Sequence, residues 1–308
     1  MPRILLYRLL QLPLILAVIY VTTFILVWVA PGDPFSGERA VDPVVEQTLR
    51  EKYRAGSAVQ FLTYYPYSIL TRGDFGPSML YKEWSVNDIV KSSLPVSIAL
   101  GVFALAIAVL IGVGVGTLAA VYRDGVLDWS SLSISLIGIS LPSFVTAALL
   151  LLLSSAPSMQ GFFAVGSWGR PMDVVLPGLA LSLAPMAYIV RLTRASMLDV
   201  LGSDFVRTAR AKGAAERTVN YKHALRNALL PVVTIIGIEA AFLLGGLIVT
   251  ETVFNIPGVA RFVVEGIKTR NYPIVQNLIM FIAFVVVVVN FLVDLTYTAL
   301  DPRIKIEE

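Results

Sequence analysis

The chain has 308 residues, of which 56% are hydrophobic and only 15% are charged, and its mean hydropathy is +0.78. Soluble domains carry about 25% charged residues, so this composition excludes an ordinary soluble enzyme and indicates a protein embedded in a lipid bilayer. The formal net charge of +3 is too small for a nucleic-acid-binding face. Cysteine is absent and His223 is the only histidine, which excludes disulfides, thiolate metal sites and clusters of imidazole ligands.

Six segments are apolar enough to cross a bilayer, because a spanning helix needs about 20 mostly apolar residues to cover a hydrocarbon layer roughly 30 Å thick. They run approximately from Leu9 to Ala30, Pro95 to Val121, Trp129 to Leu153, Val174 to Met197, Ala228 to Thr250 and Tyr272 to Leu300. The first is too long for the apolar region of a signal peptide and lacks a convincing cleavage pattern, so we expect it to be retained. The sequence therefore predicts an all-α, polytopic membrane protein with six transmembrane helices.

Basic residues in short loops predict which side of the membrane each loop occupies, because long segments cross largely regardless of charge. An N-terminus on the inside places most of the Lys and Arg residues of the short connections in the cytoplasm, including those between 191 and 226. Both chain ends are then cytoplasmic. The expected organisation is a first transmembrane helix within 1–30, an extracytoplasmic segment over 31–94, a five-helix core over 95–300 and a cytoplasmic tail over 301–308. Within 31–94, residues 46–54 are expected to form a short charged helix and residues 61–70 an aromatic amphipathic stretch, and the segment is expected to pack on the outer mouth of the bundle.

Glycines and prolines within the spans have packing explanations. Gly112, Gly114 and Gly116 lack the preceding strand and the following Lys-Ser/Thr of a nucleotide-binding loop, so the spacing from Gly112 to Gly116 indicates close helix approach instead. Pro142, Pro177 and Pro185 are candidates for helix kinks, whereas Pro231 fits the first turn of a helix.

Two carboxylates fall in the apolar spans, where a buried charge is costly enough to suggest function. For Glu239, near the middle of the fifth span, a pathway-facing or proton-sensing role and an internal hydrogen bond to a neighbouring helix both remain open. Asp294 lies near the cytoplasmic end of the sixth span, where it can also simply reach the surface or pair there. We expect the pathway to be lined chiefly by the second, third and fifth spans.

The connection from Ser203 to Leu230 is expected to be cytoplasmic and helical. Asp204 is a candidate N-cap for a helix that extends to Lys212 and ends at Gly213, and a second helix follows from Ala214 or Ala215 to Ala228. Small residues at Ala209, Ala211 and Gly213 allow close contact with another protein. An excess of basic residues also allows an alternative, in which the connection touches lipid headgroups.

The sequence of this connection, Arg-Thr-Ala-Arg-Ala-Lys-Gly at 207–213 and His-Ala-Leu-Arg-Asn-Ala-Leu-Leu-Pro at 223–231, resembles the EAA-type coupling loop of permease subunits of dipeptide, oligopeptide and nickel ABC importers. The resemblance extends along the chain through Pro-Gly-Asp-Pro at 31–34, Arg-Gly-Asp-Phe-Gly at 72–76, Glu-Thr-Val-Phe-Asn-Ile-Pro-Gly at 251–258, Arg-Asn-Tyr-Pro at 270–273 and Leu-Asp-Pro-Arg-Ile at 300–304. The chain departs from the family pattern at four positions: Arg207 and Thr208 replace the glutamate and first alanine of the named motif, Ala260 replaces a glycine, and Asn271 replaces a common aspartate.

The resemblance implies a non-enzymatic permease of a prokaryotic cytoplasmic membrane, paired with a second homologous permease, two ATPase subunits and an extracytoplasmic substrate-binding protein. ATP and Mg are then expected on the ATPase subunits, and no cofactor or metal is expected in this chain. The residues implied in ATPase coupling are Arg207, Ala209, Arg210, Lys212 and Gly213. The resemblance leaves the substrate open among dipeptides, longer peptides, nickel chelates and related solutes.

Two other classes of protein are weighed against this one. A proton-coupled secondary transporter would use Glu239 and Asp294 as its relay, and it would work without an ATPase. A membrane-embedded hydrolase would need an activated nucleophile within the spans, whereas His223 falls in the cytoplasmic connection.

Overall fold

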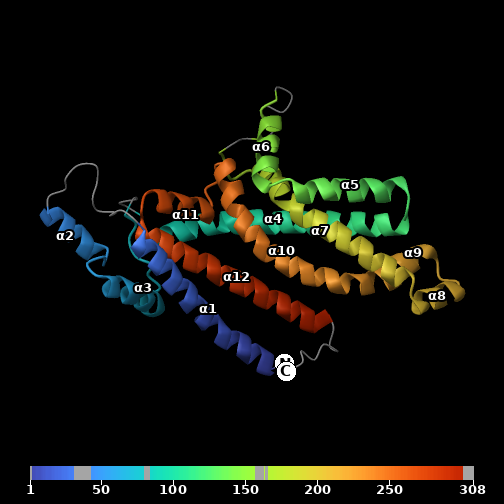
Figure 1. Ribbon diagram of the computed structural model, residues 1–308, viewed down its shortest axis with the longest axis horizontal. Helices are drawn as coiled ribbons and strands as arrows, with labels where there is room; N and C mark the ends of the chain where they lie inside the picture. Colours follow the sequence, from blue (N-terminus) through green and yellow to red (C-terminus); the bar gives the residue numbers. More distant parts are fainter. Residues whose placement is uncertain (1, 31–42, 80–83, 157–162, 164–165, 301–308) are drawn as a thin grey trace. The chain divides into compact units, whose positions relative to one another are not determined.

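The structure is a computed structural model that describes residues 2–30, 43–79, 84–156, 163 and 166–300. Within these ranges the chain is almost entirely helical, and the only strand pairing is an isolated antiparallel bridge between Pro77 and Ser85 (Figure 1). The all-α prediction is confirmed. The chain divides into two compact units, one made of residues 1–97 with 257–288 and the other of residues 98–256 with 289–308.

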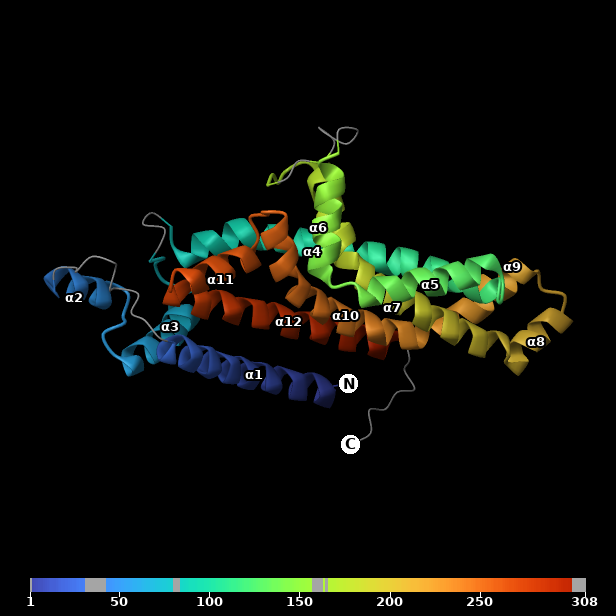
Figure 2. The same ribbon diagram turned by 45° about the horizontal axis from the view of Figure 1, so that its top comes forward.

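Five helical stretches of the described chain are long and apolar enough to cross a membrane. They lie in α1 (Pro2–Val29), in α4 (Val86–Val121), over the 3-10 turn η1 (Pro171–Val174) and α7 (Val175–Leu201), in the run that ends with α10 (Leu225–Val253), and in α12 (Tyr272–Leu300). A sixth candidate is a pair of shorter helices, α5 (Val126–Ser140) and α6 (Ser143–Ser154), bent by 105° where they meet (Figure 2). The expected span from 129 to 153 is therefore broken.

The break between α5 and α6 has a local cause. Pro142 has no backbone N–H to donate, and a residue that precedes proline is pushed toward extended backbone angles. Leu141 adopts such angles, with φ −83° and ψ 121°, and Pro142 then occupies the N-cap of α6. The kink expected at Pro142 is confirmed, and it is large enough to separate two helices.

The first unit holds α1, α2 (Pro43–Lys52), α3 (Ala58–Arg72), the start of α4, α11 (Val259–Lys268) and most of α12. The short charged helix expected at 46–54 is confirmed as α2, and the aromatic amphipathic stretch at 61–70 lies within α3. The core of this unit has an aromatic cluster around Tyr20, Phe24, Phe61 and Tyr65, and an aliphatic cluster contributed by α4, α11 and α12.

Helix α4 begins at Val86 rather than at Pro95, because a capping box precedes it. The backbone N–H of Asp88 donates to Ser85 Oγ at 3.2 Å, and the backbone N–H of Ser85 donates back to the Asp88 carboxylate at 3.0 Å. These two bonds satisfy amide groups that a helix start would otherwise leave free. Pro95 therefore lies within the helix rather than at its beginning.

In the second unit, α7 packs against α5, α6 and α10. Side chains added at Gly112 and Gly116 of α4 would collide with α7: a Cβ at Gly112 would lie 2.6 Å from Ile189, and one at Gly116 would lie 2.6 Å from the carbonyl oxygen of Val190. A Cβ at Gly114 would meet nothing within 4 Å. The predicted close approach through Gly112 and Gly116 is confirmed.

The connection after α7 contains α8 (Asp204–Ala211), the short helix α9 (Glu216–Thr218) and a π-helical turn, η2 (Val219–Ala224), which continues directly into α10. Pro231 lies in the interior of α10, so its predicted place in a first helical turn is wrong. Ser196 Oγ of α7 donates to the carbonyl of Ala228 at 2.8 Å, in the turn beside this proline. A hydroxyl on a neighbouring helix is one of the ways in which backbone groups near an internal proline are satisfied.

Candidate functional site

Helix α8 is the central element of the charged connection between α7 and α10. The predicted N-cap is wrong by one residue: Ser203 occupies that position with extended angles, and Asp204 is the first residue of the helix. Ser203 Oγ donates to the carbonyl of Val200 at 2.6 Å instead of accepting from a helical N–H. Asp204 still favours the helix electrostatically, because a carboxylate in the first turn interacts well with the helix dipole.

Gly213 turns the chain out of α8. Its φ is +79°, an angle that glycine adopts without a steric penalty. Its N–H donates to the carbonyl of Arg210 at 2.9 Å, and the N–H of Ala214 donates to the carbonyl of Ala209 at 3.2 Å. These bonds satisfy carbonyl groups at the end of the helix, so the predicted role of Gly213 in ending α8 is confirmed.

An ion pair closes the turn between α8 and α9. Arg210 Nε lies 2.9 Å from Glu216 Oε1, and Arg210 Nη2 lies 3.4 Å from Glu216 Oε2. The guanidinium and the carboxylate therefore meet in a two-pronged contact that fixes their orientation. Both side chains are partly exposed, so the pair stabilises the turn by no more than about 1 kcal/mol.

One side chain attaches α8 to the rest of the second unit. Val206 is fully buried in a cluster with Ala120 of α4, Met197 of α7 and Val219 of η2. Ala209, one turn later, is half-buried against the same cluster. The small side chain of Ala209 is therefore turned toward the chain's own core, and α8 is held against the ends of several long helices.

The opposite face of α8 is exposed. It carries a large aromatic residue, Phe205, which is 46% exposed, together with Arg207, and exposed Lys212 follows as the C-cap. Arg207 forms a weak surface pair with Asp204 at 3.4 Å. The sequence analysis missed Phe205; the signal available was an aromatic residue next to a buried valine in an otherwise polar helix.

Glu239 lies on the buried side of α10, with only 6% of its surface exposed. In the part of the chain that the structure describes, its carboxylate has no hydrogen bond or ion pair, so the internal hydrogen bond, one of the two roles left open by the sequence, is not formed there. A buried carboxylate without a partner is costly, and it requires water, a proton or a group from another subunit. Asp294 falls within α12, but its side chain lies outside the described residues.

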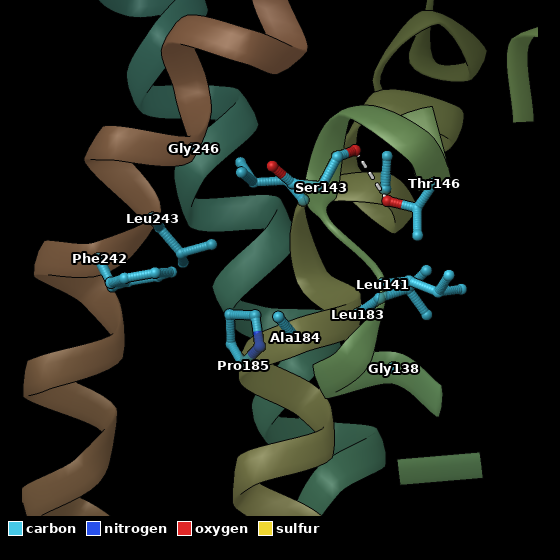
Figure 3. Close-up of a pocket in the computed structure, with 12 residues that line it drawn as sticks. Gly138, Leu141, Ser143, Thr146, Leu183, Ala184, Pro185, Phe242, Leu243 and Gly246 are labelled. Atoms are coloured by element: carbon cyan, nitrogen blue, oxygen red, sulfur yellow. Dashed lines mark hydrogen bonds between the residues drawn. The ribbon is translucent and has the colours of Figure 1, made fainter. Parts of the chain in front are cut away.

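A small cavity of about 40 Å³ lies where the α5–α6 break faces α7 and α10. Figure 3 shows Phe242, Leu243 and Gly246 of α10 on one side, and Ala184 and Pro185 of α7 below. On the third side, Thr146 Oγ1 donates to the carbonyl of Ser143 at 2.8 Å in the first turn of α6. A helix end also leaves backbone carbonyls available to other donors, so the break brings polar backbone to an otherwise apolar hollow.

A buried ion pair that the sequence analysis did not identify joins α5 to α7. Arg194 Nη2 lies 2.7 Å from the Asp128 carboxylate, and Arg194 Nε contacts its other oxygen. The backbone N–H of Asp124 also donates to this carboxylate at 3.0 Å. The Asp128 side chain is 3% exposed and that of Arg194 is 20% exposed. The pair therefore fixes the α4–α5 turn against α7, shortly before the chain enters α8.

Comparisons with known proteins agree with this architecture. The family described as "Binding-protein-dependent transport system inner membrane component" matches residues 112–306. The chain is 41% identical to the dipeptide transport system permease protein of Bacillus subtilis, over all of this chain and 99% of the relative. It is 39% identical to the oligopeptide transport system permease protein of Haemophilus influenzae, over 97% of each chain. Among solved structures, the MetNI methionine ABC transporter in an inward-facing conformation matches 69% of this chain and 96% of its own with a TM-score of 0.58; at 17% identity it shows the fold alone.

Proposed function

The chain belongs to the family of binding-protein-dependent transport system inner membrane components, and from this membership we propose that it is one permease subunit of an ATP-driven peptide importer. The relatives that support a peptide substrate match over nearly the whole chain and are named for dipeptide and oligopeptide transport. The long apolar helices fit a multi-pass protein of the cytoplasmic membrane. Hydrolysis of ATP then takes place on separate ATPase subunits, where ATP and Mg bind.

In this proposal α8 couples the permease to an ATPase subunit. The main support for this coupling role is that α8 has one buried and one exposed side. Val206 is fully buried against the ends of α4, α7 and η2, while Phe205 and the basic side chains face outward. A coupling element must move as a rigid body, because a flexible loop would absorb the displacement. Arg207 and Lys212 supply positive charge for an acidic cleft, Phe205 supplies an apolar anchor, and Arg210 and Gly213 hold the turn behind them.

The movement of α8 is transmitted into the membrane through the helices it contacts. η2 continues into α10, which carries Glu239 and one wall of the α5–α6 cavity. We place the pathway along α10 and the α5–α6 break, where backbone carbonyls can accept hydrogen bonds from peptide N–H groups. Glu239 faces either this pathway or the second permease. Water or a proton from the pathway, or a donor group on the second permease, would then satisfy the buried carboxylate. Asp294 is a second candidate for an intramembrane polar residue of the pathway.

The proposed importer contains further subunits besides this chain. A second homologous permease completes the channel, two ATPase subunits drive it, and a binding protein delivers substrate to the segment over 31–94 on the outer side. Both chain ends, including the tail over 301–308, are cytoplasmic. The alternative of a proton-coupled secondary transporter gives no reason for the rigid, outward-facing α8.

A pair of glycine substitutions tests the coupling role. Gly213→Leu forces a bulky side chain into a φ of +79°, which costs about 1 to 2 kcal/mol and disrupts the end of α8. Gly202→Leu, at the end of α7, places the same side chain at a φ of −80° without that strain. In complexes reconstituted into liposomes, we expect Gly213→Leu to lower peptide uptake per ATP hydrolysed, or to release the ATPase, while Gly202→Leu has a much smaller effect. Normal uptake and ATPase retention in Gly213→Leu would contradict the coupling role.

A further inference from the structure

Helix α3 exposes an apolar face whose occupant is not explained by the transport function. Val59 is 70% exposed, Tyr67 63% and Leu70 85%, and exposed Thr63 lies between them. At spacings of three and four residues these four side chains form a single stripe along the helix. The opposite face, with Phe61 and Tyr65, is fully buried in the aromatic cluster of the first unit.

The depth of α3 follows from its contacts with α1. α3 contacts the C-terminal half of α1 (Figure 1). The ring of Phe61 lies 6.1 Å from that of Phe24 and 6.0 Å from that of Trp28, and the hydroxyl of Tyr20 donates to the carbonyl of Leu62 at 3.1 Å. At 1.5 Å per residue, Tyr20 lies about 13 Å before the end of α1 at Val29.

Helix α12 gives an independent measure of the same depth. Met280 packs against the aromatic cluster, and it lies about 12 Å along α12 from the first residue, Tyr272. Gln276 Nε2 donates to the carbonyl of Tyr20 at 2.9 Å, which ties the two long helices together at this level. Because α1 and α12 both have the length and composition of membrane spans, the contacts of α3 fall within the half of the hydrocarbon layer nearest the end of α1.

The composition of α3 fits this depth. Charged residues are absent between Ala58 and Thr71, whereas Lys52 and Arg54 precede the helix and Arg72 ends it. The threonines on the exposed face also satisfy their own hydroxyls: Thr63 Oγ1 donates to the carbonyl of Val59 at 2.8 Å, and Thr71 Oγ1 donates to that of Tyr67 at 2.7 Å. Polar groups that bond within their own helix leave little unsatisfied polarity for a lipid environment to penalise.

We propose that α3 is an interfacial helix, and that its stripe of Val59, Thr63, Tyr67 and Leu70 rests in the acyl–headgroup boundary of the leaflet in which α1 ends. Amphipathic helices of this kind lie in the membrane plane with their apolar face in the lipid, and tyrosine is enriched at that level. The depth set by α1 and α12 favours lipid over a soluble partner. In this position α3 anchors the segment between α1 and α4 to the bilayer surface.

The inference depends on α1 crossing the bilayer and not on the transported substrate, so it can be tested separately from import. The chain has no cysteine, so single nitroxide labels can be introduced without background. We would label Tyr67→Cys and Leu70→Cys in the complete complex, held in nanodiscs of phosphatidylcholine and phosphatidylglycerol. Leu26→Cys, at an exposed position of α1, serves as the lipid control, and Glu51→Cys, at an exposed position of α2, serves as the aqueous control.

The readout is the collision rate of each label with molecular oxygen, which concentrates in lipid, and with a water-soluble nickel chelate. We expect both α3 labels to match Leu26→Cys, with high oxygen access and at least several-fold less nickel access than Glu51→Cys. Nickel access equal to that of Glu51→Cys would place the stripe in water and overturn the proposal. Protection from both reagents would show that a protein surface covers the stripe, which would overturn it equally.

Discussion

Truncation of Val206 tests how α8 is attached to the rest of the chain. Val206→Ala removes two methyl groups from a side chain with no exposed surface, in a cluster formed by α4, α7 and η2. The lost burial is about 0.8 kcal/mol for each carbon, and the cavity left behind adds to it. We therefore expect the contact of α8 with the cluster to weaken by about 2 kcal/mol. The Arg210–Glu216 pair cannot compensate, because a partly exposed pair contributes at most about 1 kcal/mol.

Amide hydrogen exchange in the isolated chain measures this attachment directly. A loss of about 2 kcal/mol raises the population of the locally open state roughly 30-fold, so the amides of 206–212 should exchange faster by a similar factor. The matched control is Phe205→Ala, which truncates the exposed neighbour and should leave this exchange unchanged.

The same two variants separate attachment from docking in the complete complex. Val206→Ala should retain ATPase subunits but transport less peptide per ATP, whereas Phe205→Ala should weaken ATPase binding. Unchanged exchange and unchanged coupling in Val206→Ala would refute the conclusion that a buried contact makes α8 rigid.

Three further predictions follow from the second unit. Gly116→Ala should lower the thermal unfolding temperature of the purified complex, because its Cβ would meet a carbonyl of α7 at 2.6 Å, whereas Gly114→Ala should be neutral or stabilising; equal effects would contradict the packing of α4 on α7. Asp128→Asn should destabilise the complex by up to about 3 kcal/mol in denaturant unfolding, since Arg194 loses its charged partner, and an unchanged midpoint would show that the pair contributes little. Glu239→Gln should change the pH dependence of peptide uptake while the complex still assembles; identical uptake at every pH would leave Glu239 with a packing role only.

Much of the fold was predictable because it depends on local or periodic properties. Long apolar runs have few solutions in a bilayer other than helices, since every backbone polar group must be satisfied internally. The spacing of Gly112 and Gly116 predicted a close helix contact, and Gly213 predicted a turn, because in each case the missing Cβ has a specific geometric consequence.

The features that were missed depend on a one-residue choice of helix start or on tertiary contacts. The cap of α8 shifted to Ser203 while Asp204 entered the first turn, a one-residue difference that composition does not resolve. Pro231 was tolerated inside α10, where the Ser196 hydroxyl of α7 donates to the carbonyl of Ala228 in the turn beside it. The Asp128–Arg194 pair joins residues that are far apart in the sequence. In the sequence, Asp128 and Arg194 look like any other charged residues near helix ends, and only the packing of α5 on α7 shows that they form a pair.

The most direct test of the central claim is uptake of a labelled peptide by liposomes that contain this chain, the second permease and both ATPase subunits. We expect uptake to require the binding protein on one side of the membrane and ATP hydrolysis on the other, and we expect a proton gradient alone to drive no uptake. Uptake by this chain under a proton gradient, without ATPase subunits or binding protein, would contradict the central claim.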